Sequence, residues 1–226
     1  MYRKYYLWFE CIAIFLVIPL LLWMRLVSIP LILIPVFIIC LPATFWLARK
    51  YGLSRNIFWS GDEQAERRQL SIIVRRFLLI SVLLLSILYV VYPAHLFDMP
   101  RQAPMLWLGL MVLYPLLSVY PQELLYRTFF FRRYSSLFTQ QRHLLLANAL
   151  LFGWMHIVFH NGLAVLYTVL GGYLFADTYH KSGSLRLSCL EHALYGNLIF
   201  TIGYGQAFLF EAWFRQFNAF ANAMSG

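Results

Sequence analysis

The chain has 226 residues, of which 62% are hydrophobic and 12% are charged, with a formal net charge of +9 at pH 7. Soluble domains carry about 25% charged residues, so the composition excludes an ordinary soluble domain. The basic residues flank apolar runs, which excludes a nucleic-acid-binding protein and is typical of a membrane protein.

The apolar runs are long enough to cross a bilayer once flanking aromatic residues and prolines are counted. A crossing helix needs about 20 mainly apolar residues, and backbone polar groups in lipid must be satisfied within the segment. We therefore predict an all-α, polytopic transmembrane bundle of seven or eight spanning helices. The predicted spans are 6–24, 28–48, 77–94, 104–122, 144–160, 163–180 and 187–205, with a short or interfacial eighth helix near 206–220.

The 18 Lys and Arg residues concentrate in alternate connecting segments. The positive-inside rule then places the N-terminus in the cytoplasm, and we expect a multi-pass protein of the cell membrane. We treat residues 1–226 as a single membrane domain. The segment 49–76 is the largest polar stretch, and it is predicted to be a cytoplasmic basic loop or a helix on the membrane surface.

An acidic residue at membrane depth is costly and is therefore a candidate functional residue. Glu123 precedes Arg127 by four residues, which puts both on one helix face as an ion pair. Pro121 favours the start of a new helical segment just before this pair. The alternative is a pair that only neutralises itself at the membrane edge.

Histidines lie within two later predicted spans. His156 is followed four residues later by His160, a spacing at which two histidines can share a metal. The pair lacks the intervening glutamate of the usual zinc-protease pattern. His192 lies between Glu191 and Asn197 in one span, where polar side chains can also hold helices together by hydrogen bonds.

A carboxylate, two imidazoles and an amide on neighbouring apolar helices have the chemistry to activate a water molecule and to stabilise an oxyanion. Three patterns occur in order: E-x-x-x-R at 123–127, F-x-x-x-H from Phe152 to His156, and His192 followed by Asn197. Together they resemble the CAAX protease and bacteriocin-processing family, also called CPBP or Abi, which includes the type II CAAX prenyl endopeptidases. The resemblance covers residues 104–205, which we expect to form the catalytic core.

The resemblance implies peptide-bond hydrolysis by a glutamate-activated water at a site within the bilayer. It places Glu123 on the family's second glutamate, which Arg127 would hold in place. Because Gln122 replaces the first glutamate, the usual general base, the base must be Glu123 or the activity is lost. The resemblance also implies that His156 helps to bind or activate the water, and that His192 and Asn197 stabilise the oxyanion. Gln122, Phe152 and Glu191 are expected to support the site. The family mechanism needs no metal or other cofactor, although the histidines leave zinc possible.

Two positions depart from the family pattern. Gln122 stands where the family has its first glutamate, so Glu123 must turn on its helix to replace it. The family places an asparagine four residues after the histidine, where this chain has Gly196. Asn197 comes one residue later, and a π-bulge would bring it to the required face.

We therefore expect an intramembrane endopeptidase of the glutamate type. Its expected partners are the lipid bilayer and a membrane-anchored or lipidated protein or peptide, cut near its terminus, whereas the oligomeric state is left open. A non-catalytic family member acting as an immunity or scaffold protein is the alternative, favoured by Gln122. A transporter or channel is a third hypothesis, against which the lack of a visible inverted repeat counts.

Overall fold

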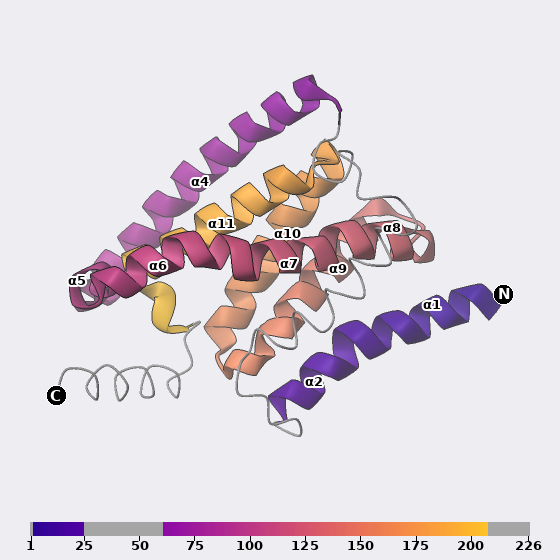
Figure 1. Cartoon of the computed structure of the whole chain (residues 1–226), viewed down its shortest axis with the longest axis horizontal. Helices are drawn as coiled ribbons and strands as arrows, with labels where there is room; N and C mark the ends of the chain where they lie inside the picture. The colour runs from indigo at the N-terminus through magenta and orange to yellow at the C-terminus, as the bar shows by residue number, and fades with distance from the viewer. Residues whose placement is uncertain (1, 25–60, 208–226) are drawn as a thin grey trace.

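The computed structural model describes residues 2–24 and 61–207, and within these residues the regular elements are helices (Figure 1). The predicted span 28–48 and the residues 49–60 lie outside the described residues. So does most of the predicted interfacial helix near 206–220. The all-helical fold class is confirmed for the described part of the chain.

The α-helices are separated in places by short π-helical or 3-10 segments. The α-helices are α1 (Tyr2–Ile12), α2 (Ile18–Trp23), α4 (Glu63–Val91), α5 (Asp98–Gln102), α6 (Pro104–Tyr114), α7 (Tyr120–Glu123), α8 (Phe130–Tyr134), α9 (Gln141–Met155), α10 (Gly162–Ser182) and α11 (Leu185–Ile202). The π-helical segments are η1 (Ala13–Val17), η4 (Pro115–Val119) and η5 (Leu124–Phe129), and the 3-10 segments are η3 (Pro93–His95), η6 (Ser135–Leu137), η7 (His156–Phe159) and η8 (Tyr204–Ala207).

Four helical stretches of the described residues are long and apolar enough to cross a membrane: Tyr2–Trp23, Glu63–Val91, Pro104–Leu137 and Gln141–Phe159. They correspond to the first, third, fourth and fifth predicted spans. Helices α10 and α11 coincide with two further predicted spans and are not among the four. The total of seven or eight spans and the cytoplasmic N-terminus stay predictions.

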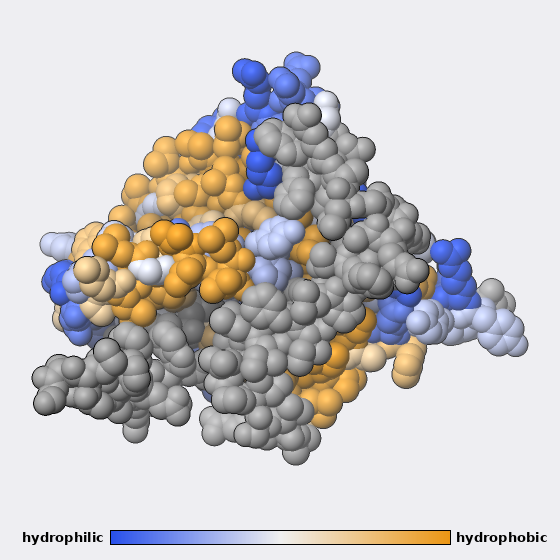
Figure 2. Space-filling model, in the orientation of Figure 1, coloured by the Kyte–Doolittle hydropathy of each residue, from blue (hydrophilic) through white to orange (hydrophobic). Residues whose placement is uncertain are grey.

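Helix α4 includes the end of the predicted basic segment. It begins at Glu63, where the Asp62 side chain accepts a hydrogen bond from the Ala65 backbone N–H at 2.9 Å and so caps the helix. The predicted span 77–94 is therefore the second half of a longer helix that ends at Val91. Figure 2 shows hydrophilic residues at the start of α4 and a mainly hydrophobic surface along the rest of α4 and along α6.

The residues from Pro104 to Leu137 form one continuous helical stretch, seen in Figure 1 as the line from α6 through α7 to α8. Pro121 lies in the first turn of α7, as predicted, but α7 does not begin a separate helix, because the backbone is already helical at Val119 before it. Two π-helical segments, η4 and η5, lie on either side of α7. Their wider turns interrupt the regular hydrogen-bond ladder, so a proline without an N–H is tolerated there.

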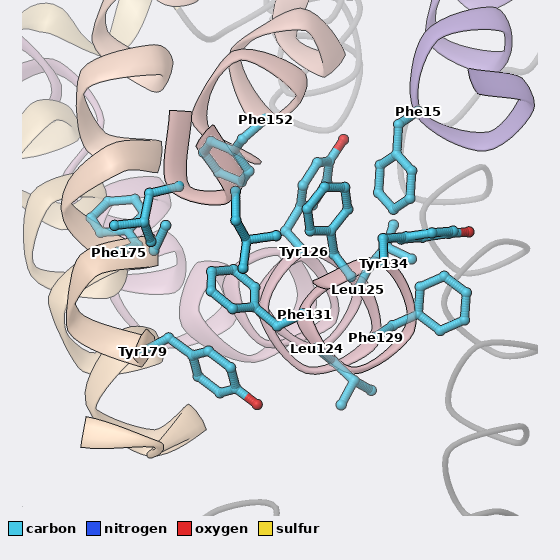
Figure 3. Packing of buried hydrophobic residues seen from close by; sticks show 14 of the residues in the cluster. Phe15, Leu124, Leu125, Tyr126, Phe129, Phe131, Tyr134, Phe152, Phe175 and Tyr179 are labelled. Carbon is cyan, nitrogen blue, oxygen red and sulfur yellow. The ribbon is translucent and has the colours of Figure 1, made fainter. Parts of the chain in front are cut away.

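An aromatic cluster forms the core where this long helix meets the first helix and α9 (Figure 3). Phe15 is 1% exposed and makes edge-to-face contacts with Tyr126, Phe130 and Tyr134, with ring centroids 5.1 to 6.0 Å apart. Tyr126 in turn contacts the Phe152 ring edge-on at 5.1 Å. Such pairs contribute about 0.5–1.5 kcal/mol each beyond their buried area, so they hold three segments distant in sequence together.

A polar contact reinforces this packing near the N-terminus. Glu10 forms an ion pair with Arg133 and accepts a hydrogen bond from the Tyr134 hydroxyl at 2.6 Å. The Glu10 carboxylate, which lies in an apolar run of the sequence, is thus neutralised by Arg133 of α8. This ion pair fixes α1 against the long helix.

Helices α9 and α10 pack closely against each other at Gly153. A Cβ atom on this residue would lie 2.2 Å from a methyl group of Val169, 3.1 Å from the Val169 backbone nitrogen and 3.2 Å from the Val165 carbonyl oxygen. Small residues at such crossings let transmembrane helices pack backbone against backbone. Gly153 therefore sets the distance at which α9 presents its polar residues to the rest of the bundle.

We expect Gly153→Ala to lower the thermal unfolding temperature in detergent, because the added methyl group must push α10 away, at a cost of about 1–3 kcal/mol. Gly109→Ala is the matched control, since Gly109 also lies inside an apolar helix and has nothing within 4 Å of its added Cβ. Equal unfolding temperatures for the two variants would contradict the close approach at Gly153.

Candidate active site

Glu123 and Arg127 form an ion pair in the interior of the protein. Both residues are 0% exposed, and Arg127 Nε donates to Glu123 Oε2 at 3.0 Å while Nη2 lies 3.4 Å from Oε1. The predicted pair is thus present, and it lies inside the bundle. Each charge is buried at a cost that only its partner and further hydrogen bonds can offset.

Two other helices supply those hydrogen bonds. From α11, the Ser188 hydroxyl donates to Glu123 Oε2, and the His192 Nδ1 lies 2.9 Å from Glu123 Oε1. From α9, the Asn148 side chain accepts from the Arg127 guanidinium and donates to the Tyr126 carbonyl oxygen at 2.8 Å. Glu123 therefore lies where the long helix, α9 and α11 converge.

Ser188 and Asn148 are not among the site residues predicted from the sequence. Ser188 and His192 are four residues apart on α11, so they share one helix face. That spacing was a usable signal for a common partner on another helix. Asn148 precedes Phe152 by four residues on α9 in the same way, but nothing local to it indicates a buried arginine as its partner.

The hydrogen bonds of His192 define which of its nitrogens carries the proton. A carboxylate with a charged partner only accepts hydrogen bonds, so His192 Nδ1 is the donor toward Glu123. Since Arg127 already balances the charge of Glu123, a neutral imidazole keeps the site neutral. In that neutral form Nε2 is an acceptor, and the Tyr114 hydroxyl, 3.0 Å away, donates to it.

Aromatic rings surround these polar groups. The Phe175 ring stacks on the His192 imidazole with centroids 4.6 Å apart, and the Phe152 ring meets the imidazole edge-on at 5.5 Å. The Arg127 guanidinium carbon is 5.0 Å from the centroid of the Phe152 ring, a cation–π distance. Phe152 thus contacts both the arginine and the histidine, which gives the predicted supporting residue a structural role.

His156 lies beside this centre and has no hydrogen bond to it that the structure describes. Its Nδ1 donates to the Phe152 carbonyl oxygen at 2.7 Å, and its ring is 4.9 Å from the Phe152 ring. In the neutral form, Nε2 of His156 therefore keeps its lone pair. The residue as a whole is buried, with 8% of its surface exposed.

The spacing of His156 and His160 does not make a metal pair. The chain after Met155 continues as the 3-10 segment η7, and His160 has a left-handed backbone and stacks on Trp23 with ring centroids 5.7 Å apart. Within residues 2–24 and 61–207, no group of three or more His, Cys, Asp and Glu side chains is arranged to hold a metal ion.

Two predicted residues point elsewhere. Gln122 donates from Nε2 to the Ser118 hydroxyl on its own helix at 2.7 Å. Asn197 donates to the Met111 carbonyl oxygen at 3.3 Å. Helix α11 is a regular α-helix through Asn197, so the predicted π-bulge is wrong. The π-helical segments flank Glu123 instead, where they set the face on which its carboxylate lies.

Glu191 belongs to a second polar cluster, which lies next to this centre. Its Oε2 accepts a hydrogen bond from the Thr178 hydroxyl at 2.5 Å, and its Oε1 is 3.8 Å from an Arg76 nitrogen. Arg76 also pairs with Asp177 at 2.8 Å. This cluster joins α4 to α10 and α11, so Glu191 supports the helix that carries His192 without contacting the Glu123 carboxylate.

The fold and this centre define a helical membrane protein with a buried glutamate, arginine and histidine at the convergence of its helices. Residues 100–198 match the family model described as type II CAAX prenyl endopeptidase Rce1-like. This match confirms the resemblance that the three sequence motifs indicated, and the matched residues contain all three motifs. It supports an activity of the protease kind. No curated protein and no solved structure is similar enough to count as a match.

We expect Arg127→Met to destabilise the protein by about 3–5 kcal/mol, because it leaves the Glu123 carboxylate buried without a counter-charge. The double variant Glu123→Gln, Arg127→Met should recover part of this loss, since it removes both charges. The measurement is thermal unfolding in detergent at fixed lipid content.

Arg67→Met is the matched control for this series. Arg67 pairs with Glu63 at the same spacing of four residues but on an exposed surface of α4, at 3.9 Å. Its loss should leave the unfolding temperature near that of the wild type. A double variant less stable than Arg127→Met would show that the two charges do not depend on each other.

Proposed function

We propose that the protein is an intramembrane endopeptidase of the glutamate type that hydrolyses a peptide bond near the terminus of a membrane-anchored or lipidated protein. The observation that carries this proposal is the 2.9 Å hydrogen bond between a fully buried Glu123 and His192 within apolar helices. The match of residues 100–198 to a protease family supports the same class of reaction. The site would need no metal.

The hydrogen bonds of Glu123 favour one assignment of the proton acceptor. A carboxylate has about four acceptor positions, and Glu123 receives donors from Arg127, Ser188 and His192 on both oxygens. In place of the direct base role expected from the resemblance, Glu123 therefore acts through His192, which it orients as the acid of a catalytic triad does. The nitrogen that takes the proton from the attacking water is His192 Nε2.

The reaction then proceeds in two steps. Water adds to the scissile carbonyl carbon and gives a proton to His192 Nε2, and the imidazolium that forms is stabilised by the Glu123 carboxylate. The tetrahedral intermediate collapses by breaking the carbon–nitrogen bond, and the same proton passes to the leaving amine. His156 Nε2 accepts a hydrogen bond from the water, whereas Asn197 takes its predicted role at the oxyanion only after leaving the Met111 carbonyl.

The surroundings of the site favour a substrate that comes from the bilayer. Large hydrophobic side chains along α4 and α6 are exposed on the protein surface, as Figure 2 shows. Exposed apolar faces of this extent are covered by lipid in a membrane protein. A substrate that is anchored by a helix or by a lipid chain therefore approaches the bundle through the bilayer.

A non-catalytic role is the second candidate, and two observations favour it. Gln122 stands at the position of the family's first glutamate and is held within its own helix by Ser118. Glu123 is closed off from the protein surface. A chain of this kind would bind its partner in the membrane, as an immunity or scaffold protein, and would use the ion pair only to hold its helices together.

We expect Glu123→Gln and His192→Gln each to lower the cleavage of co-expressed membrane-anchored and lipidated substrates by at least about 100-fold, the usual contribution of general acid–base catalysis. The measurement is the ratio of cut to uncut substrate at matched levels of membrane-inserted protein. Glu63→Gln and His143→Gln are the controls, because both side chains are exposed and remote from the centre.

The outcomes separate the two candidate functions. Cleavage by the wild type and by both controls, with loss in the two site variants, would support the protease. Unchanged cleavage by Glu123→Gln would sink the glutamate mechanism. If the wild type cuts nothing across a broad panel of substrates but still captures a membrane partner, the binding role is the correct one.

A further inference from the structure

Tyr114 reaches the candidate site from a helix in which the sequence motifs place no residue. It is the last residue of α6, directly before the π-helical segment η4. Its hydroxyl is 3.0 Å from His192 Nε2, and its ring meets the imidazole edge-on with centroids 6.0 Å apart. The Phe200 ring packs edge-on against it at 5.3 Å, so the phenol is held in place from α11.

Gly196 makes room for this phenol. A Cβ atom on Gly196 would lie 2.2 to 2.5 Å from three atoms of Tyr114, including the hydroxyl oxygen. Non-bonded atoms do not approach so closely, hence any other residue at position 196 would displace the ring. Because Gly196 follows His192 by one helical turn, the space that it leaves open lies beside the imidazole.

We propose that Tyr114 is a positioning residue of the candidate site and that Gly196 is the residue that admits it. The phenol donates to His192 Nε2 and the carboxylate of Glu123 accepts from Nδ1, so both neighbours select the same tautomer of a neutral imidazole. Nε2 thereby keeps its lone pair, and it is the nitrogen that meets the attacking water. The catalytic part of this proposal rests on the proposed function, whereas the tautomer does not.

The Tyr114 hydroxyl and the attacking water donate to the same nitrogen, His192 Nε2, one after the other. Before substrate binds, the phenol occupies the Nε2 acceptor position and fixes the ring. When water takes that position, the phenol hydroxyl turns its hydrogen bond from Nε2 to the oxygen of that water and so keeps the water beside the imidazole. Removing the hydroxyl therefore slows the proton-transfer step, whereas the substrate contacts made elsewhere stay the same.

The first test measures the tautomer directly. The full-length protein, labelled with nitrogen-15 in histidine and reconstituted in phosphatidylcholine bilayers, is compared by NMR with Tyr114→Phe, and His192→Gln assigns the signals. We expect His192 to carry its proton on Nδ1 in the wild type, and the Nε2 signal to shift when the hydroxyl is removed. A proton on Nε2 in the wild type, or an Nε2 signal that Tyr114→Phe leaves in place, would overturn the proposal.

The second test measures cleavage. We expect Tyr114→Phe to lower kcat by about 10- to 100-fold while KM changes by less than about twofold. Tyr195→Phe is the matched control, since Tyr195 is a buried tyrosine of α11 whose hydroxyl has no hydrogen-bond partner among the described residues. Equal kcat values for the two variants would overturn the positioning role.

A third variant checks the part played by Gly196. Gly196→Ala should cause the same loss of kcat and the same shift of the Nε2 signal as Tyr114→Phe, because its methyl group displaces the phenol. The double variant Tyr114→Phe, Gly196→Ala should lose no more kcat than either single variant, since both substitutions remove the same hydrogen bond. If the wild type cleaves no substrate, the proposed function fails, yet the NMR comparison still decides whether Tyr114 holds His192.

Discussion

The structure depends on one interaction, the ion pair between Glu123 and Arg127 in the interior of an apolar bundle. Two buried charges are tolerated only when their remaining donors and acceptors are satisfied. That requirement brings Ser188 and His192 from α11 and Asn148 from α9 to the same point. The helices of the second half of the chain therefore converge on a charge pair as well as on an aromatic core.

Aromatic rings enclose the Glu123–Arg127 ion pair and give it surroundings that suit catalysis as well as stability. Phe152 and Phe175 cover the imidazole and the guanidinium, so the electrostatic interactions between the charged groups act in a medium of low polarity and are strengthened. Because Arg127 supplies the counter-charge of Glu123, a neutral His192 can donate from Nδ1 to the carboxylate and keep the lone pair of Nε2.

The sequence predicted the features that are local and missed those that depend on how helices cross. The spacing of four residues between Glu123 and Arg127 indicates a pair on one helix face, and the order of the three motifs predicts the family. Neither pattern contains Tyr114, because its contact with His192 depends on the register between α6 and α11. The π-helical segments had no local signal either, so the sequence placed one near Asn197, whereas the structure has them on both sides of Glu123.

The two departures from the family pattern have different physical consequences. The loss of a side chain at Gly196 is matched by a phenol that enters the vacated space from another helix and reaches the same imidazole, so the donor beside His192 is kept. The amide of Gln122 has no such replacement, since it is bound within its own helix by Ser118. An amide cannot take up a proton, so a single carboxylate remains in this centre. Glu123 must therefore both balance Arg127 and orient His192, and a protein in which it did only the first would keep the fold and lose the chemistry.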